Sequence, residues 1–197
     1  MEKQTKTINY FLRPGYKNTA ALIDAVRQRM VELGITHVVV ATNSGNTARK
    51  FWEGLHDLDM TLVAVTGHAG YSGKDELDVA LEIRHDLNQK GIKILTCSHA
   101  LSGVARSITN KFGGISHVEI IAHTLRLFGE GVKVAVEIAV MAADAGLLPT
   151  DREIIAVGGT GKGADAALVL KAAHMNNFFD LKICEIIAMR RGKHASG

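Results

Sequence analysis

The sequence HVVVATNSGNTARKFWEGL, at residues 37–55, gives the clearest indication of the fold class. Its first part is a short apolar run rich in valine, which is typical of a buried strand in a parallel sheet. Its last part, residues 47–55, has the pattern of an amphipathic helix. Between them lie small or polar residues and one glycine: Thr42, Asn43, Ser44, Gly45, Asn46 and Thr47. The stretch therefore predicts a strand that passes directly into a helix.

The alternation of strand and helix patterns continues along the chain. Apolar runs predict five strands, at residues 36–41, 61–65, 92–96, 154–157 and 183–189. Helical patterns occur at residues 19–33, 47–55, 75–89 and 164–173, and three more, at 102–111, 116–127 and 132–145, follow the third strand. Because a minimal crossover needs fewer helices, we expect a helical insertion there. The pattern predicts one domain over residues 1–197, a three-layer α/β/α sandwich with right-handed crossovers.

The composition limits the functional classes. Of the 197 residues, 47% are hydrophobic and 22% are charged, as is typical of globular proteins, and the net charge is +3. This mild excess suits an anionic small ligand and is too weak to predict nucleic-acid binding. The two isolated cysteines, the polar N-terminus and the charges within the longest apolar segment, residues 132–148, predict a cytoplasmic protein without a membrane span.

A second glycine-rich loop follows the fourth predicted strand, and its residues are Gly158, Gly159, Thr160, Gly161, Lys162 and Gly163. In open α/β sheets, ligands bind beyond the carboxyl ends of the strands. We expect a helix start after each loop, where free N–H groups and the helix dipole favour an oxyanion. The two loops together therefore predict an anion or phosphate site. The alternative for each loop alone is a tight turn with a helix cap.

Neither loop matches a standard nucleotide motif. Gly163 occupies the position where a Walker A motif has Ser or Thr for its metal ion. The spacing of Gly159 and Gly161 fits only the dinucleotide-binding variant that ends in alanine, here Ala164, and no acidic residue follows at the usual separation. The sequence thus predicts a phosphate site without identifying the ligand.

Other reactive side chains follow the second and third predicted strands. Thr66, Gly67 and His68 follow one strand, and His99 follows the other. A histidine here suits a general acid or base, but a loop histidine bonded to the backbone is the simpler interpretation. Cys97 at a strand end is interpreted as a buried, inert cysteine rather than a reactive thiol. We expect no metal site.

Several segments resemble a known family. The loop at residues 41–48, the strands at 62–66 and 154–157 and the segments GVKVAVEIAVMAADAGLLP, at 131–149, and GGTGKGADAA, at 158–167, resemble the C-terminal α/β domain of pyruvate kinase. The chain is still more similar to a family of small prokaryotic proteins that consist of such a domain alone. For that family the segments TINYFLRPGYKNT, SHALSGVARSI and NNFFDLKICEI, at residues 7–19, 98–108 and 176–186, are also typical.

The resemblance implies a mixed five-stranded sheet of order 3-2-1-4-5 with the last strand antiparallel. In pyruvate kinase this domain holds an allosteric sugar-phosphate site, whose phosphate loop corresponds to residues 43–47, and it contributes to subunit contacts. Members of the stand-alone family are associated with flavin mononucleotide (FMN). The catalytic barrel of the enzyme is absent from these 197 residues, so pyruvate kinase activity is not expected.

These observations lead to one leading hypothesis and two alternatives. The leading hypothesis is a protein that binds a small phosphorylated ligand, FMN by resemblance, between the loops at residues 42–47 and 158–163. The first alternative is a flavin-dependent oxidoreductase in which His68 or His99 assists proton transfer. The second is a regulatory subunit that senses a sugar phosphate. The resemblance also implies a homo-oligomer.

Overall fold

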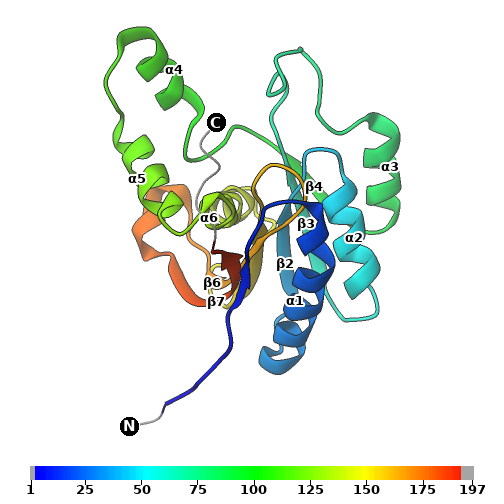
Figure 1. Ribbon diagram of the computed structural model, residues 1–197. Helices are drawn as coiled ribbons and strands as arrows, with labels where there is room; N and C mark the ends of the chain where they lie inside the picture. The colour runs from blue at the N-terminus through cyan, green and yellow to red at the C-terminus, as the bar shows by residue number, and fades with distance from the viewer. Residues whose placement is uncertain (1–2, 192–197) are drawn as a thin grey trace.

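A mixed β-sheet forms the centre of the protein (Figure 1). The computed structural model describes residues 3–191; residues 1–2 and 192–197 of the predicted single domain lie outside the described part. The described strands are β1 (Asn9–Phe11), β2 (His37–Ala41), β3 (Thr61–Thr66), β4 (Lys93–Thr96), β5 (Ile154–Gly158), β6 (Ala166–Lys171) and β7 (Lys182–Arg190). Their order in the sheet is β1-β7-β6-β5-β2-β3-β4.

Helices cover both faces of the sheet (Figure 1). The α-helices are α1 (Thr19–Leu33), α2 (Asn46–Leu55), α3 (Leu81–Gln89), α4 (Gly103–Phe112), α5 (His117–Arg126) and α6 (Glu130–Asp144), with 3-10 helices η1 (Tyr16–Asn18) and η2 (Met175–Asp180). Helices α1, α2 and α3 pack on one face and α6 on the other, while α4 and α5 form an arm beyond α6. Among residues 3–191, no helix is both long and apolar enough to cross a bilayer.

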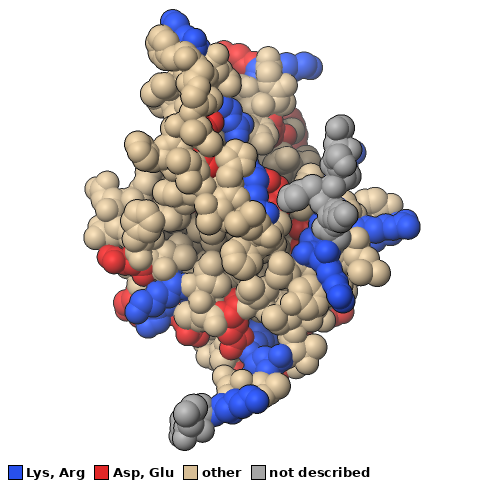
Figure 2. Space-filling view, turned by 60° about the vertical axis from the view of Figure 1, so that its left-hand side comes forward, with Lys and Arg blue, Asp and Glu red and all other residues tan. Residues whose placement is uncertain are grey.

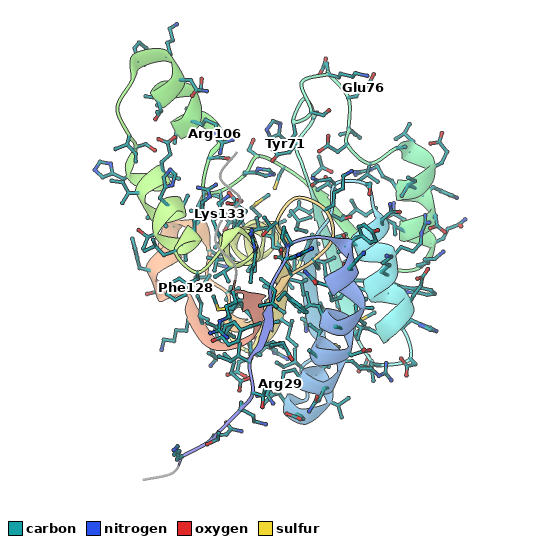
Figure 3. The ribbon with its side chains drawn as sticks, viewed as in Figure 1. Arg29, Tyr71, Glu76, Arg106, Phe128 and Lys133 are labelled. Carbon is teal, nitrogen blue, oxygen red and sulfur yellow. The ribbon has the colours of Figure 1, made fainter. Side chains whose placement is uncertain are left out.

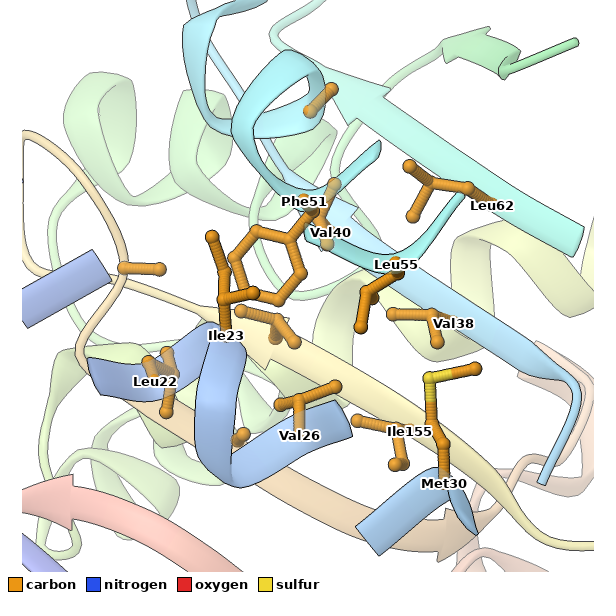
Figure 4. Close-up of a cluster of buried hydrophobic side chains, with 14 of the residues drawn as sticks. Leu22, Ile23, Val26, Met30, Val38, Val40, Phe51, Leu55, Leu62 and Ile155 are labelled. Atoms are coloured by element: carbon orange, nitrogen blue, oxygen red, sulfur yellow. The ribbon is translucent and has the colours of Figure 1, made fainter. Parts of the chain in front are cut away.

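The alternation of side chains along the strands divides the core into two clusters. Val38 and Val40 belong to the cluster under α1 and α2, whereas Val39 between them belongs to the cluster under α6. Figure 4 shows the first cluster, where Phe51 of α2 packs among aliphatic side chains from α1 and the sheet. Strand β2 is buried on both faces, and this explains why its central residues are all apolar instead of alternating with polar ones.

Helix α6 lies unusually close to β5, and two glycines permit this approach. A Cβ atom added to Gly158 would lie 2.1 Å from the Gly131 carbonyl oxygen and 2.8 Å from the Ala135 nitrogen. A Cβ added to Gly131 would lie 2.8 Å from the Cβ of Ala166 in β6. The first turns of α6 therefore rest directly on the sheet, and this contact fixes the position of the charged side chains that α6 carries.

Two expectations about the sheet are wrong. The sheet has seven described strands rather than five, because residues 164–173 form β6 instead of a helix and because β1 was missed. The alanine-rich segment favours a helix by propensity, but residues 166–170 are buried between β5 and β7, and this tertiary context prevails. Strand β1 has only three residues, too few to show a periodic pattern.

The predicted strand order is correspondingly incomplete. The expected order corresponds to β4-β3-β2-β5-β7, and β6 lies between β5 and β7. Strand β6 is antiparallel to both neighbours, and β7 is parallel to β1. The predicted antiparallel last strand is therefore wrong, since the hairpin of β5 and β6 reverses the chain before β7 begins.

Apart from the segment at residues 164–173, the predicted helices are confirmed, one of them with a shifted start. The helical insertion after β4 is present as α4, α5 and α6. Helix α3 begins at Leu81, whereas the sequence pattern placed its start at residue 75. Residues 75–80 instead close the loop after β3, where a Cβ added to Gly67 would lie 2.3 Å from Oδ2 of Asp78.

Candidate functional site

A cavity of about 760 Å³ lies at the carboxyl ends of β2, β3 and β5. Its walls come from the loops after β2, β3, β4 and β5, from η1, and from one side of α4 and α6. Figure 3 shows Tyr71, Arg106 and Lys133 on three of these elements. Both the volume and the position at the strand ends are typical of a small-molecule site.

The first predicted loop forms one wall of the cavity at the start of α2. Asn43, Ser44, Asn46 and Thr47 line the cavity. No side chain caps α2, and its first backbone hydrogen bond runs from Arg49 N to the Gly45 carbonyl, 3.0 Å away. The amide groups at the start of the helix therefore have no acceptor within the helix. This wall presents N–H donors, hydroxyl groups and the positive end of a helix dipole.

Two residues of this loop have distinct roles. Gly45 does not line the cavity; it has φ +81°, and a Cβ added there would lie 2.6 Å from Cγ2 of Ile83 in α3. Its conformation and its close packing thus both require glycine. Thr42 lines the cavity and is 4% exposed, yet its Oγ1 has no hydrogen-bond partner within the described chain. A buried hydroxyl without a partner is costly, so a ligand group or an ordered water that hydrogen-bonds to Thr42 Oγ1 would remove this cost.

The second predicted loop reaches the same cavity but without a helix behind it. Gly159, Gly161, Lys162 and Gly163 line the cavity, whereas Gly158 and Thr160 do not. Because β6 follows this loop, the helix dipole expected here is absent, and that part of the prediction is wrong. The loop is held by hydrogen bonds of 3.2 Å from Thr160 N to Asp165 Oδ2 and from Ala164 N to Thr19 Oγ1.

The cavity walls carry an excess of positive charge. Five cationic side chains, Lys50, Arg106, Arg126, Lys133 and Lys162, face two carboxylates, Glu130 and Glu137, which leaves a difference of three charges. The carboxylates pair with Arg126 at 2.6 Å and with Lys133 at 2.5 Å. Within the described chain, Lys50, Arg106 and Lys162 form no ion pair, so the walls favour an anion.

The ion pair of Lys133 and Glu137 is almost completely buried in α6. The two residues are 4% and 3% exposed, and Glu137 Oε1 also accepts a 2.8 Å hydrogen bond from Leu101 N. Leu101 precedes α4, so the pair joins the cavity wall to the base of the arm. Removing both charges from water costs free energy, which their mutual attraction offsets, so loss of one partner leaves the other charge buried and uncompensated.

The predicted residues after β3 and β4 meet beside the cavity. Thr66, Gly67 and His99 line it, whereas His68 does not, and the His68 and His99 ring centroids are 5.7 Å apart. His68 Nδ1 lies 2.7 Å from the Ala69 carbonyl oxygen, as the simpler interpretation of a backbone-bonded histidine predicts. Burial lowers the pKa of His99, which favours its neutral form. Cys97 is half-buried, and burial raises the pKa of its thiol.

Several cavity residues were missed by the sequence analysis. Tyr71 contributes a ring 5.1 Å from that of His99, and Lys50 lies three residues beyond the first predicted loop. The others are distant in sequence from the predicted residues: Tyr16, Thr19, Arg106, Arg126, Lys133 and Glu137. Charges four residues apart in the apolar segment 132–148 were a usable signal for the buried pair. Within residues 3–191, no group of His, Cys, Asp and Glu side chains has the arrangement of a metal site.

The fold and the cavity define an α/β protein with a positively charged small-molecule cavity at the ends of its parallel strands. The model of the family described as "Pyruvate kinase, alpha/beta domain" matches residues 20–170. The chain therefore belongs to this family, which confirms the resemblance to the C-terminal α/β domain of pyruvate kinase.

Pyruvate kinases from Cryptosporidium parvum are among the similar solved structures. One, in complex with ADP, has a TM-score of 0.42 and 17% identity, and the match covers 79% of this chain and 24% of the pyruvate kinase. A second has a TM-score of 0.42 and 16% identity, with 79% and 23% covered. The chain thus spans about a quarter of the length of these enzymes.

Proposed function

We propose that the protein binds a small phosphorylated ligand in the cavity, with the phosphate at the start of α2, and that this ligand is FMN. The observation that carries the proposal is the uncapped helix N-terminus in the wall of a 760 Å³ cavity, beside cations that form no ion pair within residues 3–191. Asn46 and Thr47 supply N–H groups there, and Lys50 lies one turn further along α2. A helix start of this kind stabilises a phosphate through hydrogen bonds and its dipole.

The rest of the cavity suits the remainder of FMN. Tyr71, His99, Val134 and Ile138 offer aromatic and apolar surface, and Thr42 Oγ1 offers a hydrogen-bonding group without a partner in the described chain. A ribityl chain needs such polar groups, and a flavin ring needs flat apolar contact. The glycines at 159, 161 and 163 let the backbone approach a ligand without an intervening Cβ. The residues present therefore fit the group.

A comparison of FMN with riboflavin tests the phosphate position, because the two differ only in the phosphate. FMN should bind the wild-type protein at least about tenfold more tightly, as expected for charge-assisted hydrogen bonds. Lys50→Ala and Lys162→Ala should reduce this preference and leave riboflavin binding unchanged. Lys74→Ala removes the same charge from an exposed residue outside the cavity and serves as the matched control.

Two outcomes would overturn the assignment. Equal affinity for FMN and riboflavin would show that the phosphate group does not contribute to binding. If Lys74→Ala lowered the preference for FMN as much as Lys50→Ala does, the preference would depend only on the net charge of the protein. Gly45 is a poor position for such a test, because any side chain there would collide with α3. If fructose 1,6-bisphosphate binds and FMN does not, the function as a sugar-phosphate sensor is supported and the function as a flavin protein is rejected.

A flavin-dependent oxidoreductase is the second candidate, favoured by His99, whose pKa is lowered by burial, beside Tyr71 in the cavity wall. When bound, FMN would supply the hydride and electron transfer. His99 would hold or accept a proton next to the ring. Reduction of the bound flavin by NADH or NADPH, slowed in His99→Gln, supports this candidate; a flavin that stays oxidised with both donors counts against it.

A further inference from the structure

Helix α4 is amphipathic, with its polar face toward the cavity and its apolar face exposed on the outside of the molecule. Val104, Ile108 and Phe112 are spaced four residues apart on one face, and they are 76%, 52% and 75% exposed. Arg106 lies on the opposite face and lines the cavity. Figure 3 shows Arg106 on the side of α4 that turns toward Tyr71. The polar face is thus directed inward and the apolar face outward.

Such an arrangement is unfavourable for an isolated molecule. A surface helix is stabilised mainly by burial of its apolar stripe, and a short helix without such burial is marginal in water. Helix α4 has ten residues and buries none of its side chains. Figure 2, which brings the side of the arm forward, shows a broad surface over α4 and α5 with few charged residues. We therefore expect another apolar surface to cover this face.

We propose that the outer face of α4 pairs with α4 of a second copy of this chain, antiparallel about a two-fold axis at Ile108. The stripe is self-complementary in this arrangement, because Ile108 meets its own symmetry mate and the small Val104 faces the large Phe112. Isologous interfaces require this kind of self-matching surface. The cations of α4 do not oppose each other, since Lys111 falls opposite Ala105 and Arg106 lies on the cavity side of the helix.

The size of the face also fits a second copy. The three side chains of the stripe and Ile115, which follows α4 and is 59% exposed, give the arm four exposed apolar side chains. These expose on the order of 400 Å² together, which is the size of the largest apolar patch of a typical monomer, a patch that is often functional, and about half of the ~800 Å² that each partner gives to a standard interface. The flanking surfaces of α4 and α5 supply the remainder. A membrane is a poorer occupant, because lipid-binding segments carry about four to eight basic residues and α4 carries Arg106 and Lys111 alone.

The test compares two charge insertions by analytical ultracentrifugation over a range of protein concentrations. Wild-type protein should dimerise, and Ile108→Asp should raise the dimer dissociation constant by more than about thirtyfold, as for a central interface residue. Val31→Asp is the matched control, because Val31 is a lone 66% exposed valine on α1. Ile108 is not buried, so Ile108→Asp should keep the wild-type circular dichroism and unfolding curve.

The antiparallel arrangement about Ile108 is tested separately by disulfide cross-linking. In a Cys184→Ser background, Ile108→Cys should form a disulfide-linked dimer on mild oxidation, and Val31→Cys should not. A wild-type monomer at every concentration overturns the proposal, as does a dimer that survives Ile108→Asp. Binding of a monomeric protein to phosphatidylserine vesicles, lost in Ile108→Asp, would assign the face to a lipid surface instead.

Discussion

The buried ion pair in the cavity wall gives the sharpest prediction about stability. Lys133→Met keeps much of the side-chain length and apolar character but removes the ammonium group. Among the described residues, Glu137, which is 3% exposed, then keeps only the hydrogen bond from Leu101 N. Breaking a buried pair in this way costs about 3–5 kcal/mol, because the remaining charge has lost both water and its partner.

This loss is a large part of the stability of a domain, which is about 5–15 kcal/mol. At roughly 2–4 °C per kcal/mol for a chain of this length, the melting temperature should fall by on the order of 10 °C. The assay is urea unfolding of ligand-free protein, followed by circular dichroism. The wild-type and variant curves should have the same slope and different midpoints.

A double variant distinguishes lost charge compensation from lost packing. In Lys133→Met with Glu137→Gln, the glutamine oxygen can still accept from Leu101 N and no charge is left buried. Neutral replacement of a buried pair is often close to neutral in stability, so most of the loss should be recovered. A single variant that loses less than about 1 kcal/mol, or a double variant no better than the single one, would refute the reasoning.

Three further predictions follow from the same contacts. Gly158→Ala should destabilise the protein by about 1–3 kcal/mol or more in urea unfolding, because its Cβ would collide with the Gly131 carbonyl of α6; Gly161→Ala, whose Cβ meets open space, should lose only about 1–2 kcal/mol from its φ of +81°, and equal losses would count against the contact. Burial lowers the pKa of His99 below its usual 6.5, so the unfolded chain binds more protons than the folded chain as the pH falls below 6.5, and the free energy of unfolding decreases there. Unfolding curves of His99→Gln should show a smaller decrease than those of the wild type, and equal decreases would contradict this sign. Thr42→Val should leave ligand-free stability unchanged or raise it by up to about 1 kcal/mol, because it removes an unpartnered hydroxyl, and should weaken FMN binding in a fluorescence titration; a clear loss of stability would show that Thr42 Oγ1 already has a partner.

The sequence predicted the local elements well and the sheet incompletely. Strands β2, β3 and β5 are buried on both faces, so their apolar runs were unambiguous. The alanine-rich segment that becomes β6 has no β-branched residue except Val169, and only its pairing with β5 and β7 makes it a strand. No local pattern carries that information, because it depends on neighbours distant in sequence.

The candidate site divides in the same way. Loop residues such as Asn46 and Lys162 were recognised from glycine spacing next to predicted strands. Arg106 and Tyr16 were missed, because only the folded chain brings α4 and η1 to the strand ends. The same limit applies to Gly158, which was expected to face a ligand and instead faces the backbone of α6.

The central claim, our proposal that the cavity binds a phosphorylated ligand and that this ligand is FMN, is tested most directly by release of what the protein carries. The protein is purified in phosphate-free buffer and denatured, and the visible spectrum and mass spectrum of the released material are recorded. The account predicts FMN in a near-stoichiometric amount, or, if the protein is purified empty, saturable FMN binding that riboflavin does not match. Release of no phosphorylated molecule together with no FMN binding in titration would contradict it.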